Sequence, residues 1–187
     1  RFRDTDCRAN QNYVGQPLSY HKQLVHYVCP KPDDLPELMA GLLAAHQVMK
    51  DGEVPAIIHA AAISYGFVFM HPFEDGNGRI HRFLIHNILF LRGAIPKGLM
   101  FPVSAAMLKN PALYDHSLEA FSSPLVRLVE YDLDDLGQMT VPGETGGIGR
   151  SRDALDARTQ RGELVFHVVI ATIEVIDAVD DGLALPD

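Results

Sequence analysis

The side chains whose types and spacing could do chemistry lie within twelve consecutive residues, from His71 to Arg82. They read His-Pro-Phe-Glu-Asp-Gly-Asn-Gly-Arg-Ile-His-Arg. An imidazole with an ordinary pKa of about 6.5 can take a proton from a hydroxyl group at neutral pH, so His71 is a candidate general base. Asp75 is a hard oxygen ligand that could hold Mg²⁺ on a phosphate, since Mg²⁺ usually takes only one or two protein carboxylates.

The glycines and arginines of this stretch favour a site for a polyanion. Apolar runs flank the stretch on both sides, which predicts a helix, a tight polar loop and a second helix. Gly76, Asn77 and Gly78 would present backbone N–H groups at the start of the second helix, where the helix dipole attracts an anion. Arg79 and Arg82 share one face of that first turn. Two cations at a helix N-terminus suggest that a polyphosphate lies among them.

The simpler interpretation is a polar turn between two helices with a C-cap glycine. A lone Gly-x-Gly or a lone histidine would favour it, and His59, His81 and His86 are interpreted as surface or core histidines. The joint occurrence of base, carboxylate, Gly-Asn-Gly and paired arginines favours a functional site. Phe73 is expected to point into the core and Glu74 into solvent. No Lys-Ser/Thr follows the glycines and no strand precedes them, so the loop is neither a Walker A loop nor a dinucleotide fingerprint.

The stretch resembles the signature of Fic domains, His-x-Phe-x-Asp/Glu-Gly-Asn-Gly-Arg-x-x-Arg, and every specified position is present. The resemblance extends more weakly from about residue 14 to about residue 133. It implies a mainly α fold, a Fic-type helical bundle with a short β-hairpin flap near the active site and a second small hairpin after the core. Most Fic proteins with the intact signature transfer AMP from ATP to a Ser, Thr or Tyr hydroxyl of a target protein, releasing pyrophosphate.

The resemblance also implies roles for individual residues. His71 would deprotonate the target hydroxyl, and Asp75 would bind the Mg²⁺ that bridges the α- and β-phosphates of ATP. Arg79 would hold the β-phosphate and Arg82 the γ-phosphate. The anion hole for the α-phosphate would be formed by Gly76, Asn77 and Gly78.

Tyr114 is a further candidate for the nucleotide site. Many Fic domains have two adjacent tyrosines in this region, with one ring near the adenine, whereas this chain has Leu113-Tyr114. A core tyrosine is the alternative interpretation of Tyr114.

Composition limits the class of protein and of partner. The chain has 187 residues, 47% of them hydrophobic, which is enough for one domain with a substantial core. Its formal net charge of −8 argues against nucleic acid as the main partner. No apolar run is long enough to span a membrane and no signal peptide is visible. Cys7 and Cys29 make neither a disulfide framework nor a metal site, so a cytoplasmic location is expected.

Hydrophobic periodicity predicts the helices around the site. They are expected over residues 33–49, 54–70, 78–92, 104–109 and 111–121. Asp33 or Asp34 is expected to cap the first, Ser104 the fourth, and Gly93 to end the third. The second is apolar all round and should be central. The core stripe of the first helix is expected to comprise Leu35, Leu38, Met39, Leu42, Leu43 and His46.

Two hairpins and a C-terminal segment complete the predicted organisation. Residues 18–30 could form a hairpin, and the resemblance implies a flap that aligns the target segment beside His71 by strand addition, a plain surface loop being the alternative. Residues 126–141 are expected to form a hairpin around a turn at 134–137. Residues 142–149 are interpreted as a Gly-rich linker, 151–161 as helix-compatible and 164–179 as helical.

The expected division of the chain has three parts. Residues 1–32 form an N-terminal segment with the flap, 33–123 the catalytic core, and 124–187 the second hairpin, linker and helical segment. Because the sequence begins with Arg1 and not Met, it is expected to be a piece of a longer protein.

Many Fic enzymes are restrained by a helix with the pattern Ser/Thr-x-x-x-Glu-Gly/Asn, whose Glu pairs with the second motif arginine, here Arg82. Neither Thr140 to Glu144 nor Thr159 to Glu163 completes this pattern. The hypothesis is that the inhibitory helix lies upstream of Arg1 or on an antitoxin-like partner. Fic proteins often dimerise, so a homodimer is left open.

Three classes of function remain open at this point. The first is AMP transfer to a protein hydroxyl. The second is another Fic-type transfer, of a phosphoryl, phosphocholine or UMP group, or removal of AMP from a target. The third is a non-catalytic nucleotide-binding adaptor. The intact Gly-Asn-Gly-Arg segment and the presence of His71, Asp75 and Arg82 favour the first.

Overall fold

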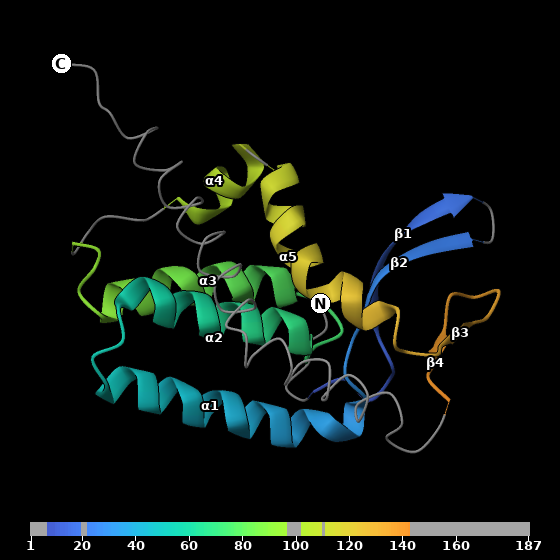
Figure 1. The fold of residues 1–187 in the computed structure, drawn as a ribbon, viewed down its shortest axis with the longest axis horizontal. Helices are drawn as coiled ribbons and strands as arrows, with labels where there is room; N and C mark the ends of the chain where they lie inside the picture. The colour runs from blue at the N-terminus through green and yellow to red at the C-terminus, as the bar shows by residue number, and fades with distance from the viewer. Residues whose placement is uncertain (1–6, 20–21, 97–101, 110, 143–187) are drawn as a thin grey trace.

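The computed structural model describes residues 7–19, 22–96, 102–109 and 111–142, without the side chains of Ser19, Ala106 and Leu113. The described part is mainly α-helical and carries two small antiparallel hairpins, which confirms the predicted fold class (Figure 1). The helices are α1 Leu35–Asp51, α2 Ala56–Met70, α3 Asn77–Leu91, α4 Val103–Lys109 and α5 Pro111–Val126, with a 3-10 turn, η1, at Pro32–Asp34. The strands are β1 Tyr13–Ser19, β2 Lys22–Val28, β3 Asp132–Leu133 and β4 Met139–Thr140.

Helix α2 is the central helix, as its apolar sequence predicts. It lies between α1 and α3, and nine of its fifteen residues are buried (Figure 1). It begins at Ala56 and not at the predicted Val54. Val54 precedes Pro55, and the residue before a proline disfavours helical backbone angles. The main core cluster joins α2, α3 and α4 through Ala60, Ile63, Ile85, Ile88, Leu89, Ile95, Val103 and Met107.

Helix α1 differs from its prediction in two ways. Leu35 is fully buried and Leu42 packs on the core, but Leu38 is 39% exposed and Leu43 is 64% exposed. The predicted core stripe is therefore too wide, because α1 packs mainly on α2 and only a narrow face is covered. Asp34 stands at the N-cap, yet its side chain makes no capping bond. The preceding 3-10 turn holds it at φ −83° and ψ −17°, whereas a capping side chain needs extended backbone angles.

Helix α3 ends as predicted. Gly93 has φ +71°, and the N–H groups of Gly93 and Ala94 donate to the carbonyls of Phe90 and Leu89, which is a Schellman motif. Helix α4 begins at Val103, so Ser104 lies inside its first turn and is not the predicted cap. Helix α5 continues to Val126 through Pro124, beyond the predicted end at residue 121.

The first hairpin is longer than predicted and is tied to the helices at its base. Strand β1 starts at Tyr13 and pairs antiparallel with β2, with irregular register after Val14 and Pro17. At the base of β2, the ring of Tyr27 lies 5.4 Å from that of Phe69 on α2, and Phe69 lies 4.2 Å from Phe121 on α5. The far ends of β1 and β2 extend away from the helices (Figure 1).

The second hairpin has the predicted turn but shorter strands. Asp134 Oδ1 accepts the N–H groups of Leu136 and Gln138, and Gly137 has φ +78°. Only two residues pair on each side. The predictions for residues 143–187 lie outside the described residues. In the part of the chain that is described, no helix has both the length and the apolar character to cross a membrane.

His59 and His81 are core histidines. His59 Nε2 lies 2.9 Å from His46 Nδ1. His81 is fully buried, and its Nδ1 donates to the Ser64 carbonyl at 2.8 Å, while its Nε2 has no partner among the described residues. Burial lowers the pKa of His81 from 6.5 to about 4, although the Ser64 carbonyl acts in the opposite direction.

The folded protein should lose stability as the pH falls below the unfolded-state pKa of His81. Between 6.5 and about 4 the unfolded chain binds a proton at this residue and the folded chain does not. The free energy of unfolding should therefore fall, by up to roughly 3 kcal/mol from this group. Urea unfolding of the wild type and His81→Asn, whose amide can still donate to Ser64, measures the effect. An equally steep pH dependence in His81→Asn would contradict the assignment.

Candidate active site

Two helix ends of opposite polarity meet in the loop that carries the candidate site. Helix α2 ends at Met70 and α3 begins at Asn77, so only His71 to Gly76 separate them. His71 is the C-cap of α2 in the left-handed region, at φ 48° and ψ 54°, and is the only non-glycine residue with positive φ in the described chain. Gly76, the N-cap of α3, has φ +92°. The loop thus places the negative end of one helix dipole beside the positive end of another.

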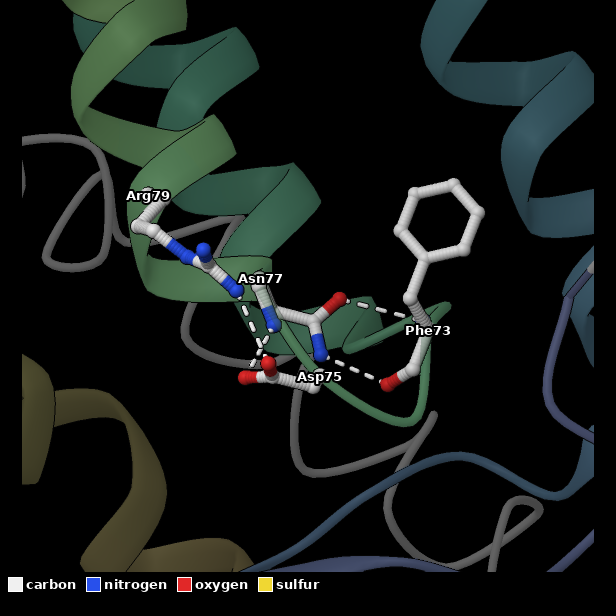
Figure 2. Close-up of polar contacts among 5 residues, drawn as sticks. Phe73, Asp75, Asn77 and Arg79 are labelled. Carbon is white, nitrogen blue, oxygen red and sulfur yellow. Dashed lines mark hydrogen bonds and ion pairs between the residues drawn. The ribbon is translucent and has the colours of Figure 1, made fainter. Parts of the chain in front are cut away.

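Asn77 holds the loop in this shape. Its side chain is 2% exposed and spans the loop to Phe73, as Figure 2 shows. Its Oδ1 accepts the Phe73 N–H at 3.0 Å, and its Nδ2 donates to the Phe73 carbonyl at 2.6 Å. Phe73 is half-buried, with its ring 6.1 Å from that of Phe67, while Glu74 is exposed, as expected. The side-chain amide of Asn77 is therefore engaged within the loop, which leaves its backbone N–H as its donor for an anion.

The Nε2 atom of His71 is unprotonated, which is the form that a general base needs. Its Nδ1 lies 2.9 Å from the Val68 carbonyl. A carbonyl only accepts hydrogen bonds, so Nδ1 holds the proton and Nε2 keeps its lone pair. Burial lowers the pKa of His71 below 6.5, the Val68 carbonyl raises it, and the charge of Arg8 lowers it further. The imidazole is therefore neutral at pH 7 and able to accept a proton.

The start of α3 offers donors to an anion. The N–H groups of Asn77 and Gly78 have no carbonyl within the helix, since the first helical bonds are those of Arg79 and Ile80 to the Gly76 carbonyl. A Cβ added at Gly76 would lie 3.3 Å from the guanidinium of Arg79. The absence of a side chain at Gly76 therefore leaves room for this guanidinium beside the start of the helix. Backbone donors and a guanidinium thus lie close together at one helix end.

Arg82 lies one turn further along α3. A Cβ added at Gly78 would lie 3.6 Å from Arg82 Nη1, so this guanidinium also reaches back towards the glycines. Its charge lowers the pKa values of His81 and Tyr114.

Asp75 and Arg79 form an exposed ion pair across the mouth of the loop. Asp75 Oδ2 lies 2.8 Å from Arg79 Nη2, and the two side chains are 89% and 71% exposed (Figure 2). Asp75 Oδ1 also accepts the Gly76 N–H at 2.6 Å. Exposed pairs of this kind contribute at most about 1 kcal/mol, so a ligand can separate them.

The fit of this loop to Mg²⁺ can be tested on its donor atoms. Among the described residues there is no group of three or more His, Cys, Asp or Glu side chains that could hold a metal ion. The loop offers two exposed carboxylates, Glu74 and Asp75, of which Asp75 is bonded to Arg79 and to the Gly76 N–H at the start of α3. This set suits a Mg²⁺ ion that is held mainly by substrate phosphates and water, and does not suit a resident metal ion.

Tyr114 lies on α5 against the same region. Its ring is 6.1 Å from that of His81 and packs on the main core cluster. Burial and, to a smaller extent, Tyr65 raise the pKa of Tyr114 to about 12, whereas the charge of Arg82 lowers it. Tyr114 is therefore a half-buried tyrosine that packs on the core, and its place in the nucleotide site stays a prediction.

Sequence reasoning missed Arg8. This residue is 3% exposed and donates from Nε to the His71 carbonyl at 2.8 Å. It also donates to the carbonyls of Asn10 and Pro30. No local pattern marks it, because its partners lie up to 63 residues away and are backbone atoms.

Comparisons with known proteins give the loop a family context. Residues 2–89 match the model of the family described as Fic/DOC family. A protein named Protein adenylyltransferase Fic from Nematostella vectensis is 40% identical over 76 residues, which are 40% of this chain and 18% of that protein. The protein of the same name from Drosophila melanogaster is 32% identical over 91 residues, 49% of this chain and 16% of that protein. The matched segment thus spans less than a fifth of these relatives.

Two solved structures share the fold. A Fic family protein from Desulfovibrio desulfuricans has a TM-score of 0.51 at 22% identity, covering 96% of this chain and 41% of that one. A Fic domain containing signaling protein from Bacteroides thetaiotaomicron has a TM-score of 0.50 at 20% identity, covering 94% of this chain and 55% of that one. The fold of this chain is therefore that of Fic proteins.

Asn77→Ala should destabilise the protein and loosen the loop. The substitution leaves the N–H and carbonyl of Phe73 without their partners, which costs about 1 to 3 kcal/mol in the free energy of unfolding. Chemical unfolding measures this loss. Asn87→Ala, at a half-buried position of the same helix, is the matched control and should cost less. Equal stability of Asn77→Ala and the wild type would show that the amide does not hold the loop.

Proposed function

We propose, from the premise that residues 2–89 of this chain belong to the Fic/DOC family, that the protein transfers AMP from ATP to a Ser, Thr or Tyr hydroxyl of a target protein. The observation that carries the proposal is the hydrogen bond from His71 Nδ1 to the Val68 carbonyl. It leaves Nε2 as a proton acceptor in the loop that leads to the N-terminus of α3. The name adenylyltransferase of the relatives supports the same reaction.

The transfer balances with the groups that the loop offers. The target hydroxyl oxygen attacks the α-phosphorus of ATP, and its proton passes to His71 Nε2. The bond between the α-phosphorus and the bridging oxygen to the β-phosphorus breaks, and pyrophosphate leaves. Little covalent work falls to the protein, so positioning and charge stabilisation supply most of the acceleration.

Each phosphate has a separate set of donors in this proposal. The N–H groups of Asn77 and Gly78 face the α-phosphate oxygens at the positive end of the α3 dipole. Arg79 leaves its pair with Asp75 to hold the β-phosphate, and Arg82 holds the γ-phosphate. The charge that develops on the leaving pyrophosphate is then neutralised from one helix face.

Asp75 would hold the Mg²⁺ that accompanies ATP. The ion would neutralise the negative charge of the phosphates and so make the α-phosphorus easier to attack. When the carboxylate turns to the metal, Arg79 loses its partner and becomes available to a phosphate. The exposed pair between these residues would therefore be exchanged for two new contacts at once.

The hairpin of β1 and β2 is the proposed docking site for the target segment. Its base is fixed to α2 and α5 by the ring contacts of Tyr27, so a strand added at its edge would have a defined place relative to the loop. The same proposal includes restraint by an inhibitory helix or an antitoxin-like partner. It also includes a cytoplasmic site of action.

The direct test is label transfer from ATP to protein in a cell lysate and to the purified protein itself, with Mg²⁺ present. Label in the α-phosphate should become attached to protein, and label in the γ-phosphate should not. Transfer from the γ position would identify a kinase. Absence of transfer from both, with nucleotide bound, would favour the non-catalytic adaptor.

His71→Ala should abolish transfer while ATP affinity changes little, because the imidazole acts on the incoming hydroxyl. His116→Ala, at an exposed position on α5, is the matched control and should keep full activity. In the wild type the rate should fall only below pH 6.5, since burial lowers the pKa of His71 and the residue must be neutral to act. Full activity of His71→Ala would rule out the assigned base.

Arg82→Ala should weaken the binding of ATP. Loss of a charge-assisted contact to the γ-phosphate should reduce affinity by roughly tenfold or more, an effect of about 1.5 to 3 kcal/mol. Titrations with ATP and with AMP isolate the contribution of the γ-phosphate contact. AMP has no γ-phosphate, so it should bind the wild type and Arg82→Ala alike. Arg127→Ala, at an exposed arginine outside the loop, is the control. An equal loss for AMP would place Arg82 elsewhere in the site.

A further inference from the structure

Arg8 connects three backbone segments at the end of α2. Its guanidinium donates to the carbonyls of His71, Asn10 and Pro30, and its own backbone N–H donates to the Pro72 carbonyl at 2.8 Å. The residue thus binds two consecutive carbonyls of the candidate catalytic loop, one with its side chain and one with its main chain.

A buried cation of this kind is costly unless its donors are satisfied. Arg8 is 3% exposed, and among the described residues no carboxylate lies within ion-pair distance of it. Its partners are carbonyls, and the Glu74 carboxylate acts only through its longer-range charge. The guanidinium suits this role because its donors point in fixed directions within one plane, which a lysine ammonium cannot reproduce.

The location of the Arg8 guanidinium at the C-terminal end of α2 stabilises its positive charge. His71 is the C-cap of α2, where the last carbonyls of the helix carry the negative end of its dipole. A cation bonded to the C-cap carbonyl favours this end of the helix and the left-handed backbone of His71. Because that backbone sets the direction of the Cα–Cβ bond, the contact to Arg8 sets where the imidazole points.

The same side chain reaches the base of the first hairpin. Pro30 follows β2, and the neighbouring Cys29 donates its N–H to the Asn12 carbonyl at 3.1 Å. Gln11 donates to the Cys29 carbonyl at 2.6 Å. The two chains at the base of the hairpin are therefore joined to each other, and Arg8 joins them to His71.

We propose that Arg8 is a positioning residue, which holds the imidazole of His71 at a fixed place relative to the hairpin of β1 and β2. The proposal rests on the proposed function for its effect on catalysis, but its effect on the His71 side chain is independent of that function. Arg8 touches neither phosphate nor target; it acts through the carbonyl of His71.

The test compares Arg8→Met and Arg8→Lys, with Arg127→Met as the control for loss of an exposed arginine. The His71 imidazole pKa is measured by NMR on histidine-labelled protein, with His71→Ala identifying the resonance. The transfer rate and the KM for ATP are measured on the same proteins, and circular dichroism establishes that each is folded.

Arg8→Met should raise the pKa of His71, because Arg8 is the only charged group that acts on it among the described residues. It should lower kcat by roughly a hundredfold through misplacement of the base, and leave the KM for ATP within about twofold. Arg8→Lys keeps the charge but not the planar array of donors. It should therefore lower kcat while the pKa of His71 stays near that of the wild type.

A wild-type kcat in folded Arg8→Met would overturn the proposal. If Arg8→Met does not fold, Arg8→Lys decides alone, and a wild-type kcat in that variant overturns the proposal. If the wild type transfers no AMP, the proposed function fails. The pKa of His71 in the variants then still tests whether Arg8 controls the imidazole.

Discussion

The structure depends on a single chain reversal, in which the left-handed backbone of His71 ends α2 six residues before α3 begins. The carbonyl end of one helix and the N–H end of the next are thereby brought to the same place. The two ends need ligands of opposite charge, because one presents unpaired acceptors and the other unpaired donors. The first end is satisfied within the protein, by the His71 ring at the Val68 carbonyl and by Arg8 at the His71 carbonyl. The second presents donors that suit an anion from solution.

This division explains why the loop combines a rigid half and a labile half. Asn77 and Arg8 are buried and bind backbone atoms of the loop, so the backbone is held at Phe73 and at His71. Asp75 and Arg79 are exposed and bind each other. A base must be placed within a few tenths of an ångström to act, whereas the groups that meet a substrate polyphosphate must be free to exchange partners.

Local chemistry made the candidate loop and the main helices predictable. The apolar character of α2 predicts its central position, and Gly93 predicts the end of α3, because both are properties of short segments. The exposure of Leu43 was not predictable, since it depends on which helices pack against α1. The role of Arg8 was not predictable either. It arises from contacts with the backbone of distant segments, and backbone carbonyls leave no pattern in a sequence.

The measurement that tests the central claim most directly is a titration of the ¹⁵N-labelled protein with an ATP analogue and Mg²⁺, followed by NMR. The analogue carries a methylene group between the α- and β-phosphates, so that no AMP can be transferred. The account predicts that the largest amide shifts occur at Asn77 and Gly78 and that the His71 imidazole responds with them. Saturable binding that leaves these amides unmoved, or no binding, would contradict the assignment of the α3 N-terminus as the polyphosphate site.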